Sequence, residues 1–116
     1  MSRSLQAARQ ARDTLQRALL QALVKVREAV KRQYRGAARR ELRRDCGAGE
    51  HLDDDRPKLL LHRAQVVLRL READPQAFAR AGLRTGTFRH LARLVRDLTT
   101  TRQRVLALTK QHTGER

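Results

Sequence analysis

Apolar residues recur at intervals of three and four along most of this chain, and this spacing decides its fold class. It is the period of an α-helix with one buried face, whereas a half-buried strand would alternate every second residue. No stretch of the sequence alternates in that way, so we predict an all-α protein. In the first part of the chain the stripe consists of Leu15, Leu19, Leu23, Val26, Val30, Tyr34 and Ala37.

Glycine and proline divide the helical pattern into elements. Gly36 lies inside the first element and costs only about 1 kcal/mol in a helix interior, so it marks either a bend or a break between two helices. Gly47 and Gly49 end that element, because glycine supplies the positive φ found at helix C-termini. Pro57 and Pro75 stand at positions that fit the first turn of a helix. We expect helices over 4–44, 57–73, 75–81 and 87–111.

These elements predict a single domain. It would be an antiparallel helical bundle of three main helices, with a long N-terminal helix and an extra C-terminal helix. The apolar residues are mostly Leu, Ala and Val, and the aromatic residues are Tyr34, Phe78 and Phe88. Because such a core is thin, we expect marginal stability in isolation, with partner contacts adding to it.

The charge balance points to a negatively charged partner. The chain has 27 Lys and Arg against 12 Asp and Glu, a net charge of +15, and all but four of the basic residues are arginine. Self-repulsion of this size opposes compaction. A guanidinium binds phosphate and carboxylate bidentately and is desolvated more cheaply than an ammonium. We therefore expect the surface to contact RNA, an acidic protein or a membrane surface.

The arginines gather in two bands. The first closes the first long element and is predicted to bind an acidic partner; it consists of Arg32, Arg35, Arg39, Arg40, Arg43 and Arg44. The second follows the last helix and would bind a nucleic-acid backbone; it consists of Arg89, Arg93, Arg96, Arg102 and Arg104. Neither band contains the interleaved aromatic residues that stack on single-stranded bases. An RNA partner would therefore be recognised by its phosphate backbone and its shape.

Motifs typical of catalysis are missing from the sequence. It has no glycine-rich phosphate loop, no paired histidines for zinc and no nucleophile elbow. A single Cys46 gives neither a disulfide nor a metal-site spacing. The acidic run 53–55 lacks the alternating spacing of a calcium loop and is interpreted as charge at a helix N-terminus. We expect a protein that is not an enzyme, without a metal, a directly bound cofactor or a transmembrane segment.

The first twenty residues are rich in Arg, Ser and Ala, and their first acidic residue is Asp13. This composition is typical of a mitochondrial targeting segment, and equally of a basic amphipathic helix. We expect a location on the matrix side of mitochondria with an uncleaved N-terminus.

Residues 15–73 resemble the LYR-motif family of small, basic, helical mitochondrial proteins, which are named for a Leu-Tyr-Arg near the start of their first helix. The corresponding tripeptide here is Leu15-Gln16-Arg17, with Gln in place of Tyr. Tyr34-Arg35 matches an aromatic–Arg pair of the family. The stretch 39–45 resembles its Arg-rich second signature, with Leu42 in place of Phe. The resemblance covers about half of the chain and leaves residues 87–111 unexplained.

The resemblance implies a function. Such proteins are accessory subunits or assembly factors of respiratory complexes, iron–sulfur machinery and mitochondrial ribosomes, and many bind the acyl carrier protein, whose acyl-phosphopantetheine enters the helical bundle. The carrier would face Arg17, Arg35, Arg39, Arg40 and Arg43, and the acyl tunnel would be lined by Leu19, Leu23, Val67 and Leu68. We therefore expect a non-catalytic subunit or assembly factor of a large mitochondrial complex. The alternative is an RNA-binding structural protein of a ribosome, mitochondrial or otherwise.

Overall fold

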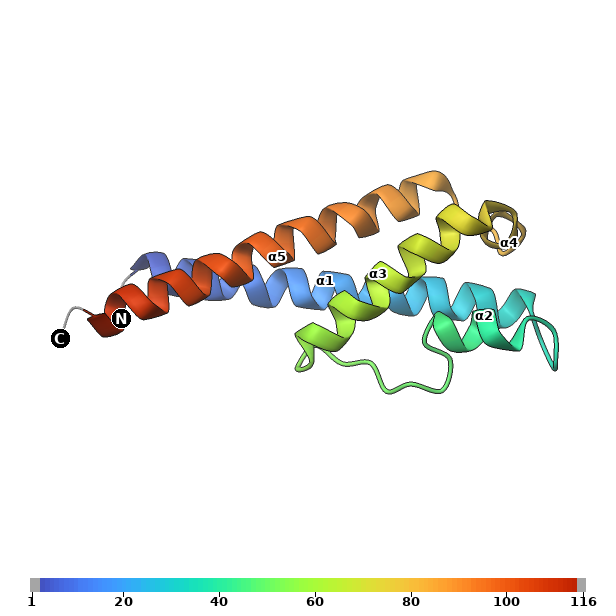
Figure 1. Cartoon of the computed structure of the whole chain (residues 1–116), viewed down its shortest axis with the longest axis horizontal. Helices are drawn as coiled ribbons and strands as arrows, with labels where there is room; N and C mark the ends of the chain where they lie inside the picture. Colours follow the sequence, from blue (N-terminus) through green and yellow to red (C-terminus); the bar gives the residue numbers. More distant parts are fainter. Residues whose placement is uncertain (1–2, 115–116) are drawn as a thin grey trace.

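The computed structural model describes residues 3–114, and all the regular secondary structure in this range is helical, which confirms the all-α prediction. Its helices are α1 (Arg3–Gln33), α2 (Arg40–Asp45), α3 (Pro57–Ala73), α4 (Pro75–Arg80) and α5 (Thr85–Gly114). α1 and α5 lie antiparallel along the molecule, and α3 crosses them obliquely in the sense opposite to α5 (Figure 1). The result is an elongated bundle measuring 58 × 25 × 18 Å.

The first long element is broken, so the prediction of one helix over 4–44 is corrected to two helices. α1 ends at Gln33 and α2 begins at Arg40. Gly36 between them has a φ of 67°, and Arg39 has a φ of 50°. The left-handed conformation costs a residue with a side chain about 1 kcal/mol, so Arg39 must be held there by other contacts.

The other boundaries differ little from the predicted ones. α3 has the predicted bounds, and α4 ends one residue earlier than expected. α5 begins at Thr85 instead of residue 87 and continues to Gly114 instead of 111. The helix can start earlier because Gly86 adopts no positive φ and is accommodated as an ordinary helical residue.

The core has a main cluster and a smaller satellite. The main cluster joins all five helices, and its two aromatic rings, Phe78 and Phe88, meet edge to face with centroids 5.2 Å apart. The satellite contains Leu5, Ala8 and Val105, with Leu108 packed against them. It lies where α1 and α5 continue beyond the N-terminal end of α3 as a two-helix stalk (Figure 1).

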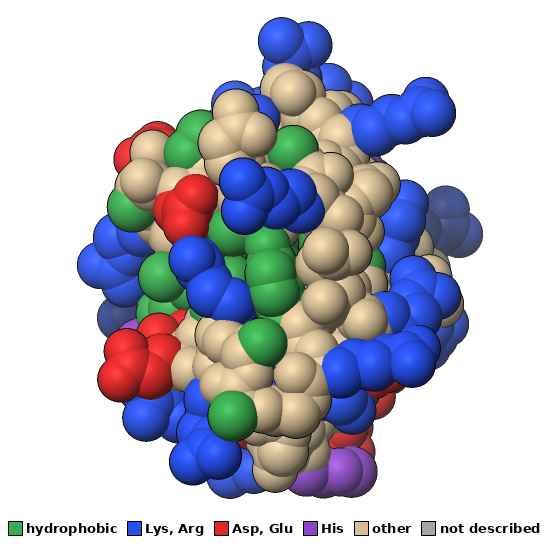
Figure 2. Space-filling model, turned by 90° about the vertical axis from the view of Figure 1, so that its right-hand side faces the viewer, with side chains coloured by type: hydrophobic (Ala, Val, Ile, Leu, Met, Phe, Trp, Pro, Cys, Tyr) green, Lys and Arg blue, Asp and Glu red, His purple; other side chains and the backbone are tan. Residues whose placement is uncertain are grey.

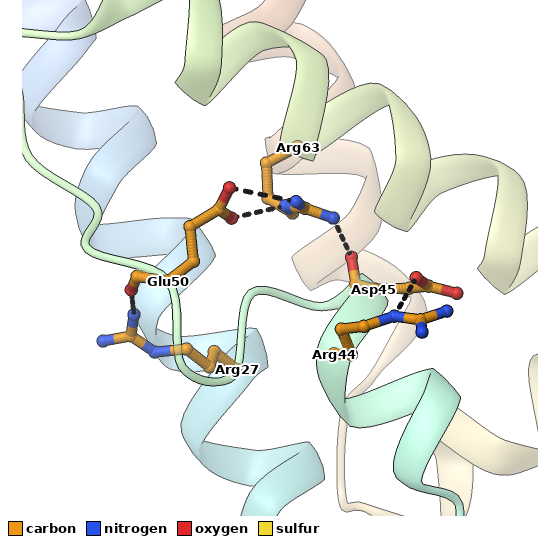
Figure 3. Close-up of polar contacts among 5 residues, drawn as sticks. All are labelled: Arg27, Arg44, Asp45, Glu50 and Arg63. Carbon is orange, nitrogen blue, oxygen red and sulfur yellow. Dashed lines mark hydrogen bonds and ion pairs between the residues drawn. The ribbon is translucent and has the colours of Figure 1, made fainter.

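One arginine fixes the long loop between α2 and α3. Arg63 donates from Nε and Nη2 to the two carboxylate oxygens of Glu50 at 2.8 and 3.1 Å, and from Nη1 to the Asp45 carbonyl at 2.7 Å. Arg27 of α1 donates to the Glu50 carbonyl at 3.1 Å (Figure 3). Since the Arg63 side chain is only 15% exposed, this arginine is a structural group and not part of the free cationic surface.

This geometry predicts that Arg63→Lys destabilises the protein although it keeps the charge. A lysine cannot bind Glu50 through two parallel N–H groups and reach the Asp45 carbonyl as well, so we expect a loss of about 2 kcal/mol in the free energy of urea unfolding. Arg69→Lys is the matched control, because Arg69 is exposed on the same helix, and it should change stability by less than about 0.5 kcal/mol. Equal effects of the two substitutions would contradict the assignment.

Candidate partner-binding surfaces

The first arginine band lies at one end of the molecule, which we call the head end. It is formed by the last turn of α1, the segment 34–39, α2 and α4. The structure brings together there six of the predicted partner-binding residues, namely Arg32, Arg35, Arg39, Arg40, Arg43 and Arg44. Arg17 does not join them, because the helix rises about 24 Å between Arg17 and the end of α1.

Three of these arginines are engaged within the protein. Arg39 donates to a carboxylate oxygen of Asp74 at 2.7 Å and lies over the Tyr34 ring, 5.6 Å from its centroid. Arg43 donates to the Gly36 carbonyl. Arg44 contacts the carboxylate of its neighbour Asp45 at 3.4 Å. Arg39 and Arg43 therefore help to hold the strained segment between α1 and α2.

The other three arginines of the head end are free. The side chains of Arg32, Arg35 and Arg40 are exposed, and they form no ion pair or hydrogen bond with any residue between 3 and 114. Figure 2 looks onto the head end and shows apolar side chains gathered near its middle, with many Lys and Arg side chains around them and a few Asp and Glu side chains on the left. The end face therefore combines an apolar centre with a cationic margin.

A hollow of about 490 Å³ opens between α2 and α3 beside this margin. Its apolar lining consists of Leu42, which is 7% exposed, and Leu70, which is half-buried. Its polar lining consists of Arg39, Arg40, Glu41 and Asp45. A hollow with an apolar floor and charges of both signs at the rim is suited to a protein side chain.

Three titrating groups near the head end have displaced pKa values, and the hydrogen bond with Asp74 raises the pKa of Arg39. The hydrogen bond from Arg39, followed by the one from the backbone N–H of Ala77, lowers the pKa of Asp74 below its ordinary 3.8. Burial raises the pKa of the Cys46 thiol to about 12. Because the reactive form of cysteine is the thiolate, Cys46 behaves as a small apolar core residue at neutral pH.

The residues predicted for an acyl tunnel do not all lie together. Leu19, Leu23 and Val67 are fully buried members of the main core cluster, and Leu68 packs against its edge. Leu68 is half-buried and lines a hollow between α3 and α5, where Phe88 and Arg89 are also found. Entry of an acyl chain between the first three would require their side chains to move apart.

The tripeptide of the family resemblance has a structural role here. Gln16 is 8% exposed and donates from its side-chain amide to the Asp54 carbonyl at 3.0 Å. Arg17 approaches the Asp54 carboxylate at 3.7 Å. Both residues therefore connect the middle of α1 to the loop that precedes α3.

The second arginine band divides. Arg102 is half-buried and lines a hollow with residues 55–59 at the start of α3. The remaining residues, Arg89, Arg93, Arg96 and Arg104, are exposed along α5. Their only ion pair with a described residue joins Arg96 to Asp97 at 3.9 Å.

Two contacts of the head end escape sequence reasoning. The Tyr34 hydroxyl donates to the Ala77 carbonyl at 2.8 Å, and Arg39 donates to the Asp74 carboxylate at 2.7 Å. The pattern around Asp74-Pro75 indicates a helix start, but it carries no signal for a partner 35 residues away.

No family model, curated protein or solved structure matches this chain. Between residues 3 and 114, no helix is both long and apolar enough to cross a membrane. In the same part of the chain, no three His, Cys, Asp or Glu side chains gather in a way that could hold a metal ion.

The lowered pKa of Asp74 predicts a pH-dependent contribution to stability. A depressed carboxyl pKa stabilises the folded state above the unfolded value of about 3.8, and this contribution is lost as the pH falls through the folded value. The stability difference between the wild type and Asp74→Asn should be constant above about pH 5 and shrink toward pH 2, as measured by urea unfolding. Arg39→Gln should remove most of this pH-dependent difference. A difference that does not change with pH would contradict the role of the Arg39 pair.

Proposed function

We propose that this chain is a non-catalytic adaptor, an accessory subunit or assembly factor that binds an acidic protein through the head end. The observation that supports this most directly is the free cationic margin of Arg32, Arg35 and Arg40, of which Arg40 also lines a hollow floored by Leu42 and Leu70. Protein interfaces combine an apolar centre with a polar rim and are enriched in arginine.

The carboxylates at the rim favour a protein over a nucleic acid as the partner of the head end. Glu41 and Asp45 line the hollow together with Arg39 and Arg40. A phosphate backbone would be repelled by the two carboxylates, whereas an acidic protein can also present a donor to each of them. Arginines around such a site increase the association rate and orient an acidic partner.

The family resemblance suggests which acidic partner to test first, and in which compartment. In this form of the proposal the partner is an acyl carrier protein of the mitochondrial matrix. Arg35 and Arg40 would contact its acidic surface, and Arg17, about 24 Å along α1, would meet a separate part of the complex. Leu19, Leu23 and Val67 are packed in the core. In this form of the proposal, most of the affinity for the carrier protein therefore comes from contacts at the surface.

The proposal predicts that the double variant Arg35→Glu/Arg40→Glu loses binding to a purified, acylated mitochondrial acyl carrier protein. Each reversal replaces attraction by repulsion at the rim, so affinity measured by isothermal titration calorimetry should fall by about tenfold or more. The matched control is Lys58→Glu/Arg69→Glu, which makes the same charge change at exposed positions of α3.

The control should bind within about threefold of the wild type, since long-range charge effects are screened at physiological salt. Equal losses in the two variants would show a diffuse charge effect and contradict a site at the head end. Absence of binding to the wild type would reject the carrier protein as the partner.

A further inference from the structure

The outward face of α5 carries a second cationic surface, which the head end does not explain. Arg89, Arg93 and Arg96 follow one another at intervals of four and three residues, which places them on one face of the helix. Arg104 lies on the same face two turns further on. The axis rises about 22 Å from Arg89 to Arg104, and α5 forms one long edge of the molecule (Figure 1).

This face is almost without compensating charge. Asp97 is the only acidic residue between 85 and 114, and it approaches Arg96 only at 3.9 Å. The side chains of Arg93 and Arg104 form no ion pair or hydrogen bond among the described residues. On α1, by contrast, Glu28 pairs with both Arg27 and Lys31, and Arg17 pairs with Asp54.

The residues on this face of α5 are polar, which indicates a different kind of partner from that of the head end. The outward positions between Arg96 and Arg104 include Thr100 and Gln103, which are polar and exposed. Leu106 is 61% exposed, but it is turned by about 200° around the helix from Arg104. An interface with another protein would need an apolar centre. The face has none between Arg93 and Arg104, and the apolar residues near Arg89 line the hollow between α3 and α5.

We infer that the outward face of α5 binds the phosphate backbone of double-stranded RNA. Arg89, Arg93 and Arg96 are spaced about 4.5 to 6 Å along a rigid axis, and Arg104 follows about 12 Å further on, which suits the regular phosphates of a duplex. A single strand would need aromatic stacking partners, but Phe88 is 4% exposed and packs on Phe78. Thr100 and Gln103 offer hydrogen-bonding groups for 2′-hydroxyls, the groups that distinguish RNA from DNA.

This second surface goes beyond the proposed function and is independent of it. A chain with an acidic protein at its head end and an RNA backbone along α5 would connect the two within one particle. Loss of either contact should leave the other intact, because the residues that carry them are different. The two proposals can therefore fail separately.

The test is binding of a 20-base-pair RNA duplex, measured by fluorescence anisotropy over a range of salt concentrations. The triple variant Arg89→Gln/Arg93→Gln/Arg96→Gln should bind about tenfold or more weakly, and the slope of log affinity against log salt should fall by about three, one for each lost contact. Glutamine is a good helix former, so circular dichroism should show unchanged folding.

The matched control is Arg32→Gln/Arg35→Gln/Arg40→Gln, which removes the same charge from the head end. It should keep the RNA affinity within about threefold and the salt slope within about one unit. An equal loss in both triple variants would overturn the inference, since binding would then follow net charge alone.

Two further arms identify the partner class. A DNA duplex of the same sequence should bind about threefold or more weakly than the RNA, because it lacks 2′-hydroxyls and has a different groove shape. A poly-glutamate peptide should bind the wild type and the α5 variant equally well. Equal affinity for DNA and RNA would overturn the assignment to RNA. A poly-glutamate affinity that depends on the three α5 arginines would replace RNA by an acidic protein.

Discussion

The apolar seam of α1 is the contact on which the rest of the structure depends. Leu19, Leu23, Val26 and Val30 are all fully buried and pack between α5 and α3, which α1 contacts along much of its length. Because one narrow face of α1 supplies these contacts, its remaining faces and the outward face of α5 are left for charged residues. A bundle built from Leu, Ala and Val can therefore carry a charge of +15 with most of its cations at the surface.

The distribution of the few carboxylates then decides which arginines are structural. Glu50 holds Arg63 and fixes the loop before α3, and Asp74 holds Arg39 at the strained joint between α1 and α2. Arg32, Arg35 and Arg40 and most of the outward face of α5 have no ion pair among the described residues, although Glu41 and Asp45 lie at the rim of the head-end hollow. The surfaces proposed to bind partners are those that internal pairing leaves uncovered.

The helices could be predicted from sequence because their periodicity and end signals are local. Pro57 and Asp74-Pro75 placed the bounds of α3 and the start of α4 correctly. The break after α1 remained open because Gly36 is compatible with a bend or a break. In the structure the helix is broken at this point. Tyr34 contacts Ala77, 43 residues away, and Arg39 contacts Asp74, 35 residues away. Such tertiary contacts leave no local pattern.

The candidate surfaces were predicted only in part, for the same reason. Sequence proximity grouped the six arginines of the head end, but it could not show that Arg39, Arg43 and Arg44 are engaged while Arg32, Arg35 and Arg40 are free. Helical spacing placed Arg89, Arg93 and Arg96 together. The same spacing turns Arg102 by about 200° from Arg104, but it could not show that Arg102 shares a hollow with residues 55–59.

The central claim is that the isolated chain carries cationic faces with too little negative charge to balance them. The most direct test is the thermal midpoint as NaCl is raised from low concentration to about 1 M, where the screening length is about 3 Å. The account predicts that the wild-type midpoint rises with salt, and that the rise is smaller when Arg89, Arg93 and Arg96 are glutamine. A wild-type midpoint that stays constant or falls would contradict it, because the charges would then already be balanced within the chain.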